Sequence, residues 1–367
     1  KDILIIAPNR VFADYISNVL PELGEESIPE NGMENILSGV LENKYRFHNF
    51  PEQISELAGN PSPEFIERIR YKATAELISQ LDKFILHIEN NYFQPTDIKV
   101  TKHFTVPGEY IEEQFRRFHR YPMRQRFEVM STYIADTIKV QYHINLTTAE
   151  RNMLKKDIRK MFTGNNDLQV YKDFFKWIGT PEMFKTRKNH TLEYSDLAPL
   201  AYLHMALDGT KNHNQAKHLL IDEMQDYTPI QYKVIQKLFS CRKTILGDAS
   251  QSVNPYGSST ADMIKKTFAT GEVMKLCKSY RSTYEITDFA QKIRKNDELE
   301  PIERHGDKPQ IIHYDNIENE ISGLTGLIEK FRASCHSSLG IVCKEERQAE
   351  MLSEKLNKKN KDIHFLS

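Results

Sequence analysis

The chain has 367 residues, more than one compact domain usually holds, so two or three domains are expected. Its 50 Lys and Arg residues balance its 51 Asp and Glu residues, and this neither favours nor excludes nucleic acid, because binding depends on a local basic patch. The four cysteines form no C-x-x-C pair, which disfavours structural zinc and indicates reduced thiols. No apolar run reaches the length of a membrane span and no signal peptide is recognisable, so we expect a cytoplasmic protein without a membrane partner.

The first element is an apolar strand over residues 3–7, followed by Pro8-Asn9-Arg10 and a helix from about Val11. On its own, Asn9 is a plausible cap of that helix. Natural chains rarely start with a lysine that leads directly into a strand, so we interpret the sequence as a piece of a longer protein.

Residues 46–190 show mainly helical periodicity, with apolar stripes over residues 62–90, 127–140 and 149–162. Residues 98–106 alternate as a short strand does. Stripes of this kind are more often core than ligand sites, so we interpret them as packing surfaces.

One segment of this region is unusual in its charge. Residues 114–126 contain no acidic residue, interleave aromatic residues, and carry five arginines: Arg116, Arg117, Arg120, Arg124 and Arg126. Arginines with aromatics suit phosphate contacts and base stacking, but equally an acidic protein partner or a solvated helix face. The sequence leaves all three interpretations open.

The most informative stretch is residues 218–221, three of which are apolar and which lead directly into Asp222 and Glu223. Such a run indicates a strand buried on both faces of a parallel sheet, and ligands of such sheets lie beyond the carboxyl ends of the strands. Two carboxylates there suit phosphoryl chemistry, since one can hold Mg²⁺ and the other can deprotonate water. The alternative is a strand followed by a helix-capping aspartate.

Two more segments downstream carry polar residues of interest. The first is a short apolar strand within residues 243–252 that ends in Gly247-Asp248 and then Gln251, and the second is a short segment, residues 275–283, that leads to Tyr280-Arg281. With the acid pair, their order and spacing resemble motifs II, III and IV of superfamily 1 helicases of the UvrD/Rep type.

This resemblance implies ATP as substrate, Mg²⁺ as cofactor, and a role for each matching residue. Asp222 would handle Mg²⁺ and Glu223 would be the catalytic base. Gln251 would sense the γ-phosphate or position the water, with support from Asp248. Tyr280 would stack on adenine. Arg281 would act as an arginine finger, worth roughly 10³–10⁵ in rate in related NTPases.

The resemblance also implies nucleic-acid contacts. The opening segment is similar to motif Ia of the HelD/helicase IV branch, in which Asn9 and Arg10 would touch single-stranded DNA. UvrD-type helicases place a Tyr and a Trp just after the motif III glutamine, but here only Tyr256 is available. Stacking contributes about 1–3 kcal/mol per base, so this departure makes strong strand separation less certain.

The implied fold is α/β, a RecA-like (P-loop NTPase) parallel sheet that lacks its first strand and phosphate loop. We expect an incomplete lobe 1A over residues 1–45 and 191–270, a mainly helical 1B-like insertion over 46–190, and the start of lobe 2A over 271–367. The chain would stop before motifs V and VI. The nearest match to G-x-x-x-x-G-K-[ST], residues 179–186, has Phe184 in place of the second glycine and is interpreted as a coincidence.

The predicted function is therefore part of an ATP-dependent helicase or translocase on single-stranded DNA, with this piece inactive as an ATPase alone. A HelD-type factor that binds and recycles RNA polymerase is the alternative, since relatives in that branch bind the polymerase. A nuclease-linked recombination motor is a third option, although the sequence shows no nuclease-like cluster of carboxylates.

Overall fold

The computed structural model describes residues 3–7, 30–210, 216–252, 259–268, 270–357 and 363–365. The predicted contact residues Asn9, Arg10 and Tyr256, and the helix predicted from Val11, lie outside these ranges. The chain divides into two compact units, Lys1–Met274 and Lys275–Ser367, each with a hydrophobic core of its own. Of the helices described, none is both long and apolar enough to cross a membrane.

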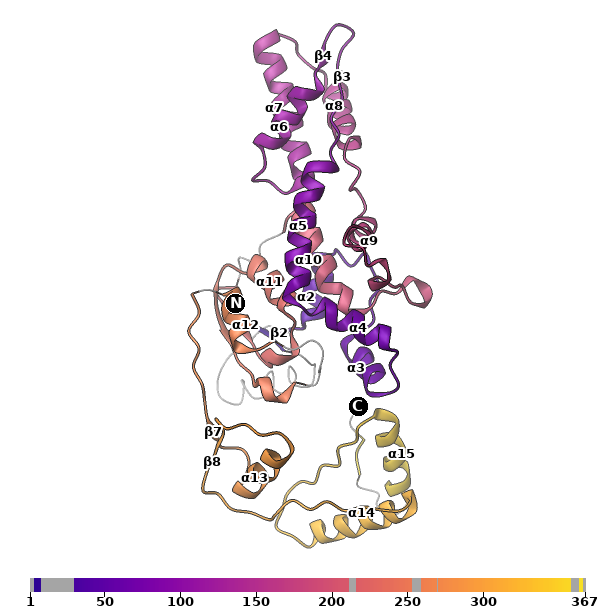
Figure 1. Ribbon diagram of the computed structural model, residues 1–367, viewed down its shortest axis with the longest axis vertical. Coiled ribbons are helices and arrows are strands. Elements are labelled where there is room, and N and C mark those ends of the chain that lie inside the picture. Colours follow the sequence, from indigo (N-terminus) through magenta and orange to yellow (C-terminus); the bar gives the residue numbers. More distant parts are fainter. Residues whose placement is uncertain are drawn as a thin grey trace. The chain divides into compact units, whose positions relative to one another are not determined.

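A four-stranded parallel sheet organises the first unit (Figure 1). Its strands lie in the order β2 (Glu30–Asn31), β1 (Ile3–Ile6), β5 (His218–Ile221) and β6 (Arg242–Ile245). Ile6, Ile221 and Ile245 are aligned, so β1, β5 and β6 end side by side. This small parallel sheet among helices agrees with the predicted α/β fold.

The burial of β5 differs from the prediction in one respect. Leu219 and Ile221 are fully buried, whereas His218 and Leu220 are only half-buried. The strand alternates because its two side-chain rows face opposite sides of the sheet, and only one row lies wholly within the core. The prediction of complete burial on both faces is therefore wrong.

Helix α10 (Leu197–Asp208) is the central element of the helical layer, because all of its residues except Ala206 and Asp208 are buried. A helix that is apolar on every side must be surrounded by other elements. The helices of the first unit around the sheet and α10 are α2 (Met33–Val40), α3 (Phe50–Ala58), α4 (Pro63–Lys72), α5 (Ala75–Asn91), α9 (Asp167–Trp177), α11 (Pro229–Leu238) and α12 (Ala261–Thr267). Short 3-10 helices connect them: η1 (Pro181–Met183), η2 (Lys188–His190), η3 (Tyr194–Asp196), η4 (Met224–Asp226) and η5 (Ala249–Gln251).

The single helix expected over residues 62–90 is in fact two helices. It breaks at Ala73-Thr74, where the Thr74 hydroxyl accepts a hydrogen bond from the Leu77 backbone N–H at 3.2 Å. That bond makes Thr74 the N-cap of a new helix, and a cap of this kind competes with helical continuation.

A buried group of charges joins α4 to the segment before α10. Arg68 pairs with Glu193 at 2.6 Å, and Lys72 contacts Glu193 at 3.3 Å and Asp196 at 2.6 Å. Tyr171 donates its hydroxyl to Asp196 at 2.9 Å. Burial alone would raise the pKa of Glu193, but Arg68 and Lys72 hold that pKa below its ordinary value. The carboxylate is thus kept charged inside the fold.

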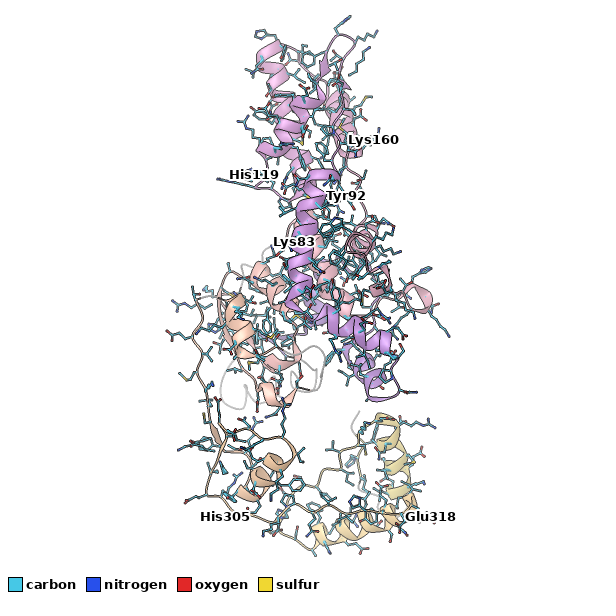
Figure 2. The ribbon with its side chains drawn as sticks, viewed as in Figure 1. Lys83, Tyr92, His119, Lys160, His305 and Glu318 are labelled. Carbon is cyan, nitrogen blue, oxygen red and sulfur yellow. The ribbon has the colours of Figure 1, made fainter. Side chains whose placement is uncertain are left out.

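An arm extends from α5. It contains a two-stranded antiparallel hairpin, β3 (Ile98–Lys99) with β4 (Thr105–Val106), and the helices α6 (Gly108–Arg117), α7 (Met123–Tyr142) and α8 (Thr148–Lys160). Figure 1 shows α6, α7 and α8 grouped beyond one end of α5, and Figure 2 labels Lys83, Tyr92 and Lys160 along α5 and at the end of α8. The alternation over residues 98–106 therefore marks a hairpin and not one strand.

Arg124 anchors the arm to the rest of the unit. Its Nε and Nη2 donate to the Gly164 carbonyl at 3.1 and 2.6 Å, and its Nη1 lies 2.6 Å from Asp167 and also contacts Asp208. Asp167 further accepts from His204 at 2.8 Å. Although Asp167, His204 and Asp208 are grouped as metal ligands can be, the Arg124 guanidinium already supplies the positive charge there.

Arg126 is also used inside the arm. It donates to the Tyr121 carbonyl at 2.7 Å and the His119 carbonyl at 2.9 Å, pairs with Glu89 at 2.5 Å, and lies over the Phe115 ring. Arg124 and Arg126 are both buried. These two arginines of the basic segment thus serve the fold, and only the other three remain candidates for a partner.

The second unit contains α13 (Tyr284–Ile293), α14 (Ile317–Arg332) and α15 (Glu346–Asn357), with a short parallel pair of β7 (Lys278–Ser279) and β8 (Glu300–Pro301). The partly apolar segments 310–314, 339–343 and 363–365 alternate with helices, as the strands of parallel β/α units would, but they form no strand. A strand needs a neighbour to pair with, and Ile311 and Val342 are 69% and 96% exposed.

We predict that Arg124→Met costs about 3–5 kcal/mol of unfolding free energy, because it leaves two carboxylates without their cation. The control is Arg116→Met, since the Arg116 side chain is 77% exposed and forms an i,i+4 pair with Glu112. That pair is worth about 0.5 kcal/mol or less. Urea unfolding measures both, and equal losses in the two variants would contradict the anchoring role of Arg124.

Candidate functional site

The carboxyl ends of three parallel strands meet at one edge of the sheet. The Asp222 N–H donates to the Ile6 carbonyl at 3.0 Å, and the Leu246 N–H donates to the Ile221 carbonyl at 2.8 Å. These bonds continue the ladders of β1–β5 and β5–β6 by one step beyond the strands. The residues that follow β5 and β6 therefore begin side by side, at the edge where ligands of such sheets bind.

Asp222 and Glu223 turn sharply away from the sheet. The Glu223 N–H donates to Asp222 Oδ1 at 2.9 Å, and Glu223 adopts a left-handed conformation with φ 50° and ψ 54°. A non-glycine residue in this region costs of order 1–3 kcal/mol, and such strain gathers at functional sites. The turn is held because the Met224 N–H bonds to the Leu246 carbonyl at 2.8 Å and the Tyr232 hydroxyl bonds to the Met224 carbonyl at 2.8 Å.

Gly247 allows the loop after β6 to approach this turn. Its φ is 154°, and a Cβ built on it would overlap Met224 N and lie 2.5 Å from Gln225 Oε1. Only glycine combines that φ with that closeness. The sequence indicates a turn at Gly247 but gives no sign of this packing requirement, because Met224 and Gln225 belong to a different loop.

Asp248 and Gln251 are joined to the acid pair through Gln225. Gln251 Nε2 donates to Asp248 Oδ2 at 2.9 Å, the Asp248 N–H donates to Gln225 Oε1 at 3.0 Å, and Gln225 Nε2 donates to Glu223 Oε2 at 2.6 Å. The structure thus brings together four of the predicted residues of the first unit. Gln225 was not predicted from the sequence, where its only signal is its place two residues after Glu223. The structure shows that this side chain is only 2% exposed.

The donor set at this edge fits Mg²⁺. Asp222 and Glu223 offer hard carboxylate oxygens, both residues are half-buried, and Asp248 adds a third carboxylate nearby through Gln225. Mg²⁺ typically takes one or two carboxylates and completes its shell with water and phosphate oxygens.

Tyr280 and Arg281 belong to the second unit, just before α13. Tyr280 is 68% exposed, and Arg281 is exposed with its carbonyl bonded by Arg304. The Tyr284 N–H donates to the Arg304 carbonyl at 2.8 Å, and Thr283 is the N-cap of α13. These contacts fix the backbone from which both side chains extend. Their grouping with Asp222 and Gln251 stays a prediction.

A second set of contacts supports the same turn. Glu285 accepts hydrogen bonds from His305 Nδ1 and from the Gly306 N–H, each at 2.9 Å. The bond from His305, followed by those from backbone N–H groups, lowers the pKa of Glu285 to about 2. His305 is labelled in Figure 2.

Comparison with known proteins shows the family of the chain. Residues 37–269 match the model of the UvrD/REP helicase N-terminal domain, which is more than half of the chain. The chain belongs to the UvrD/REP helicase family. Both the acid pair and Gln251 fall within the matched residues.

Individual relatives are distant helicases. The chain is 25% identical over 275 residues to an ATP-dependent helicase/nuclease of Lactobacillus acidophilus, covering 68% of this chain and 22% of the relative. It is 29% identical over 139 residues to the putative ATP-dependent DNA helicase YjcD of Bacillus subtilis, covering 35% and 18%. It is 25% identical over 197 residues to the ATP-dependent DNA helicase Rep of Buchnera aphidicola, covering 48% and 30%. The chain thus spans less than a third of the length of each of these relatives.

We predict that Gly247→Ala destabilises the protein by about 1–3 kcal/mol, because the added methyl group collides with Met224 and Gln225. The control is Gly39→Ala in α2, where nothing lies within 4 Å of the new Cβ. Alanine there should leave stability unchanged or raise it by up to about 1 kcal/mol. Thermal unfolding compares the two variants, and a harmless Gly247→Ala would show that the loops do not require this approach.

We predict a pH-dependent contribution from Glu285. Its folded pKa lies below its ordinary value of 4.5, so its stabilisation is present above about pH 4.5 and is lost as the pH falls through about 2. Carbon NMR of the Glu285 carboxyl follows this titration. In His305→Ala the pKa should move up toward 4.5, because the main hydrogen bond is gone, and an unchanged titration would contradict this origin.

Proposed function

We propose that the chain forms part of an ATP-driven motor that moves along single-stranded DNA. Support comes from membership of the UvrD/REP helicase family and from one structural observation: the acid pair, Asp248 and Gln251 form a hydrogen-bonded group at the carboxyl edge of the parallel sheet. The relatives described above are ATP-dependent helicases, and two of them are named as DNA helicases, which favours DNA as the track.

In this proposal Glu223 takes the proton from the water that attacks the γ-phosphate, and Gln251 orients that water or contacts the γ-phosphate. Asp222 would hold Mg²⁺, whose charge would offset the negative charge that develops on the phosphates. Asp248 keeps the Gln251 amide in place through the bond at 2.9 Å. Catalytic groups that are held in place before the reaction need no reorganisation in the transition state.

The remaining roles follow the family pattern residue by residue. Arg281 would stabilise the transferring phosphoryl group, and Tyr280, with its ring exposed, would stack on adenine. Asn9 and Arg10 would contact the DNA backbone, and Tyr256 would stack on a base.

The 367 residues contain no G-x-x-x-x-G-K-[ST] sequence. Without that loop, the backbone amides and the lysine that bind the β- and γ-phosphates are missing. We therefore propose that these residues alone turn over no ATP and that activity requires a protein in which the loop is supplied.

Two more specific activities are distinguishable by experiment. A translocase of the HelD branch would co-purify with RNA polymerase and fail to unwind duplex DNA, and the similarity of the opening segment to that branch is the observation in its favour. A DNA helicase would show ATPase stimulated by single strands together with unwinding. Because the chain is also similar to the helicase/nuclease of Lactobacillus acidophilus, the full-length protein should be assayed for nuclease activity as well.

We predict that Glu223→Gln in the full-length protein lowers the turnover of ATP in the presence of single-stranded DNA by about 10²–10⁴-fold, because it removes the general base. The control is Glu182→Gln, an exposed glutamate of η1 outside the sheet edge, which should retain full activity. Phosphate release measures both variants. Two results contradict the proposal: full activity of Glu223→Gln, or ATPase by the isolated 367 residues that disappears with the same substitution.

A further inference from the structure

Gln225 lies between the two loops that carry the proposed catalytic groups. Its Nε2 is 2.6 Å from Glu223 Oε2, and its Oε1 is 3.0 Å from the backbone nitrogen of Asp248. One amide therefore bridges the turn after β5 and the loop after β6, the loop that continues to Gln251. None of the roles assigned above includes this side chain.

The orientation of the amide follows from its two partners. The Asp248 backbone nitrogen can only donate, so it must meet the oxygen of the Gln225 amide. The nitrogen of the amide is then turned toward Glu223, whose carboxylate can only accept when ionised. If the amide were flipped, its NH2 group would face the Asp248 N–H and its oxygen would face the Glu223 carboxylate. The Asp248 N–H therefore fixes the orientation in which the Gln225 NH2 group donates to Glu223.

The space for this amide is built into the fold. Gln225 is 2% exposed, and its Oε1 lies where a side chain at position 247 would begin. A buried amide is costly unless both of its ends are bonded, and here both are. The bond to Glu223 is charge-assisted and short, which makes it stronger than a bond between neutral groups.

We propose that Gln225 is a positioning residue, which holds the Glu223 carboxylate in place for catalysis and links it to the loop of Gln251. This inference rests on the proposed function, in which Glu223 is the general base. The bond engages Oε2 of Glu223 and leaves Oε1 to accept the proton from water. Glu223 is only half-buried, and this bond holds one of its two carboxylate oxygens in place.

Such a residue acts in the chemical step and not in binding of the nucleotide. Loss of the bond would let the Glu223 side chain rotate among several positions, of which few accept the proton. Contacts to the bound phosphates and base would persist. The expected signature is a lower kcat with a nearly unchanged KM for ATP.

The first test is Gln225→Met in the full-length protein, since methionine preserves length and volume and removes both hydrogen bonds. We expect kcat for ATP in the presence of single-stranded DNA to fall about 10–100-fold, with KM within about threefold of wild type. The control is Gln114→Met on the arm, because Gln114 is equally buried at 1% exposure and is remote from the sheet edge. Unchanged kcat in Gln225→Met, or a loss carried mainly by KM, overturns the proposal.

The second test separates positioning from a general effect on packing. The side chain in Glu223→Asp is shorter by one methylene group, so its carboxylate no longer reaches the Gln225 amide as it does in the wild type. Adding Gln225→Met to Glu223→Asp should then lower kcat by less than about twofold, because the two residues act as one unit. If the double variant loses a further tenfold or more, Gln225 acts independently of Glu223 and the inference is wrong.

Failure of the underlying function gives a different result. If the wild-type protein shows no ATPase, or if Glu223→Gln retains full activity, the proposed motor function fails and Gln225 has no base to position. If Glu223→Gln is inactive and Gln225→Met is as active as the wild type, the motor function stands and only the inference about Gln225 is overturned.

Discussion

The contact between the ends of β5 and β6 is the constraint on which the candidate site depends. Gly247 lies so close to Met224 that no side chain fits between the two loops. Parallel pairing of β5 with β6 brings the loops that follow these two strands to one edge of the sheet. Because Gly247 has no side chain, the two loops can come into contact. The acid pair, Asp248 and Gln251 thereby become one bonded group, although they come from different loops.

Chemistry at this edge requires a rigid support, which the surrounding helices provide. Helix α10 is buried on nearly every side, and charges at both of its ends tie neighbouring helices to it. Near its start, Lys72 meets Asp196, and at its other end Arg124 meets Asp208. Removing one partner of such a pair leaves the other charge without its counter-ion, so these contacts disfavour arrangements that separate the helices.

The arginine-rich segment shows how composition can mislead about function. Five arginines without an acid look like a surface for phosphates, but Arg124 and Arg126 bond to carbonyls and carboxylates of their own fold. Glu89 lies 37 positions from its partner Arg126, and Asp167 lies 43 positions (167 minus 124) from its partner Arg124. Local charge cannot reveal such partners, because they are brought close only by folding.

The amino-acid sequence alone determined the parallel sheet, the acid pair at its edge and the resemblance to UvrD/Rep helicases. Those features follow from apolar runs and from residues next to them in the chain, where backbone geometry leaves few choices. Only the tertiary structure decided that Gln225 joins Glu223 to Asp248, that a predicted long helix breaks at Thr74, and that Arg124 faces inward. Each of these features depends on a polar group that could bond to several alternative partners. The packing of segments distant in the sequence determines which partner lies within reach.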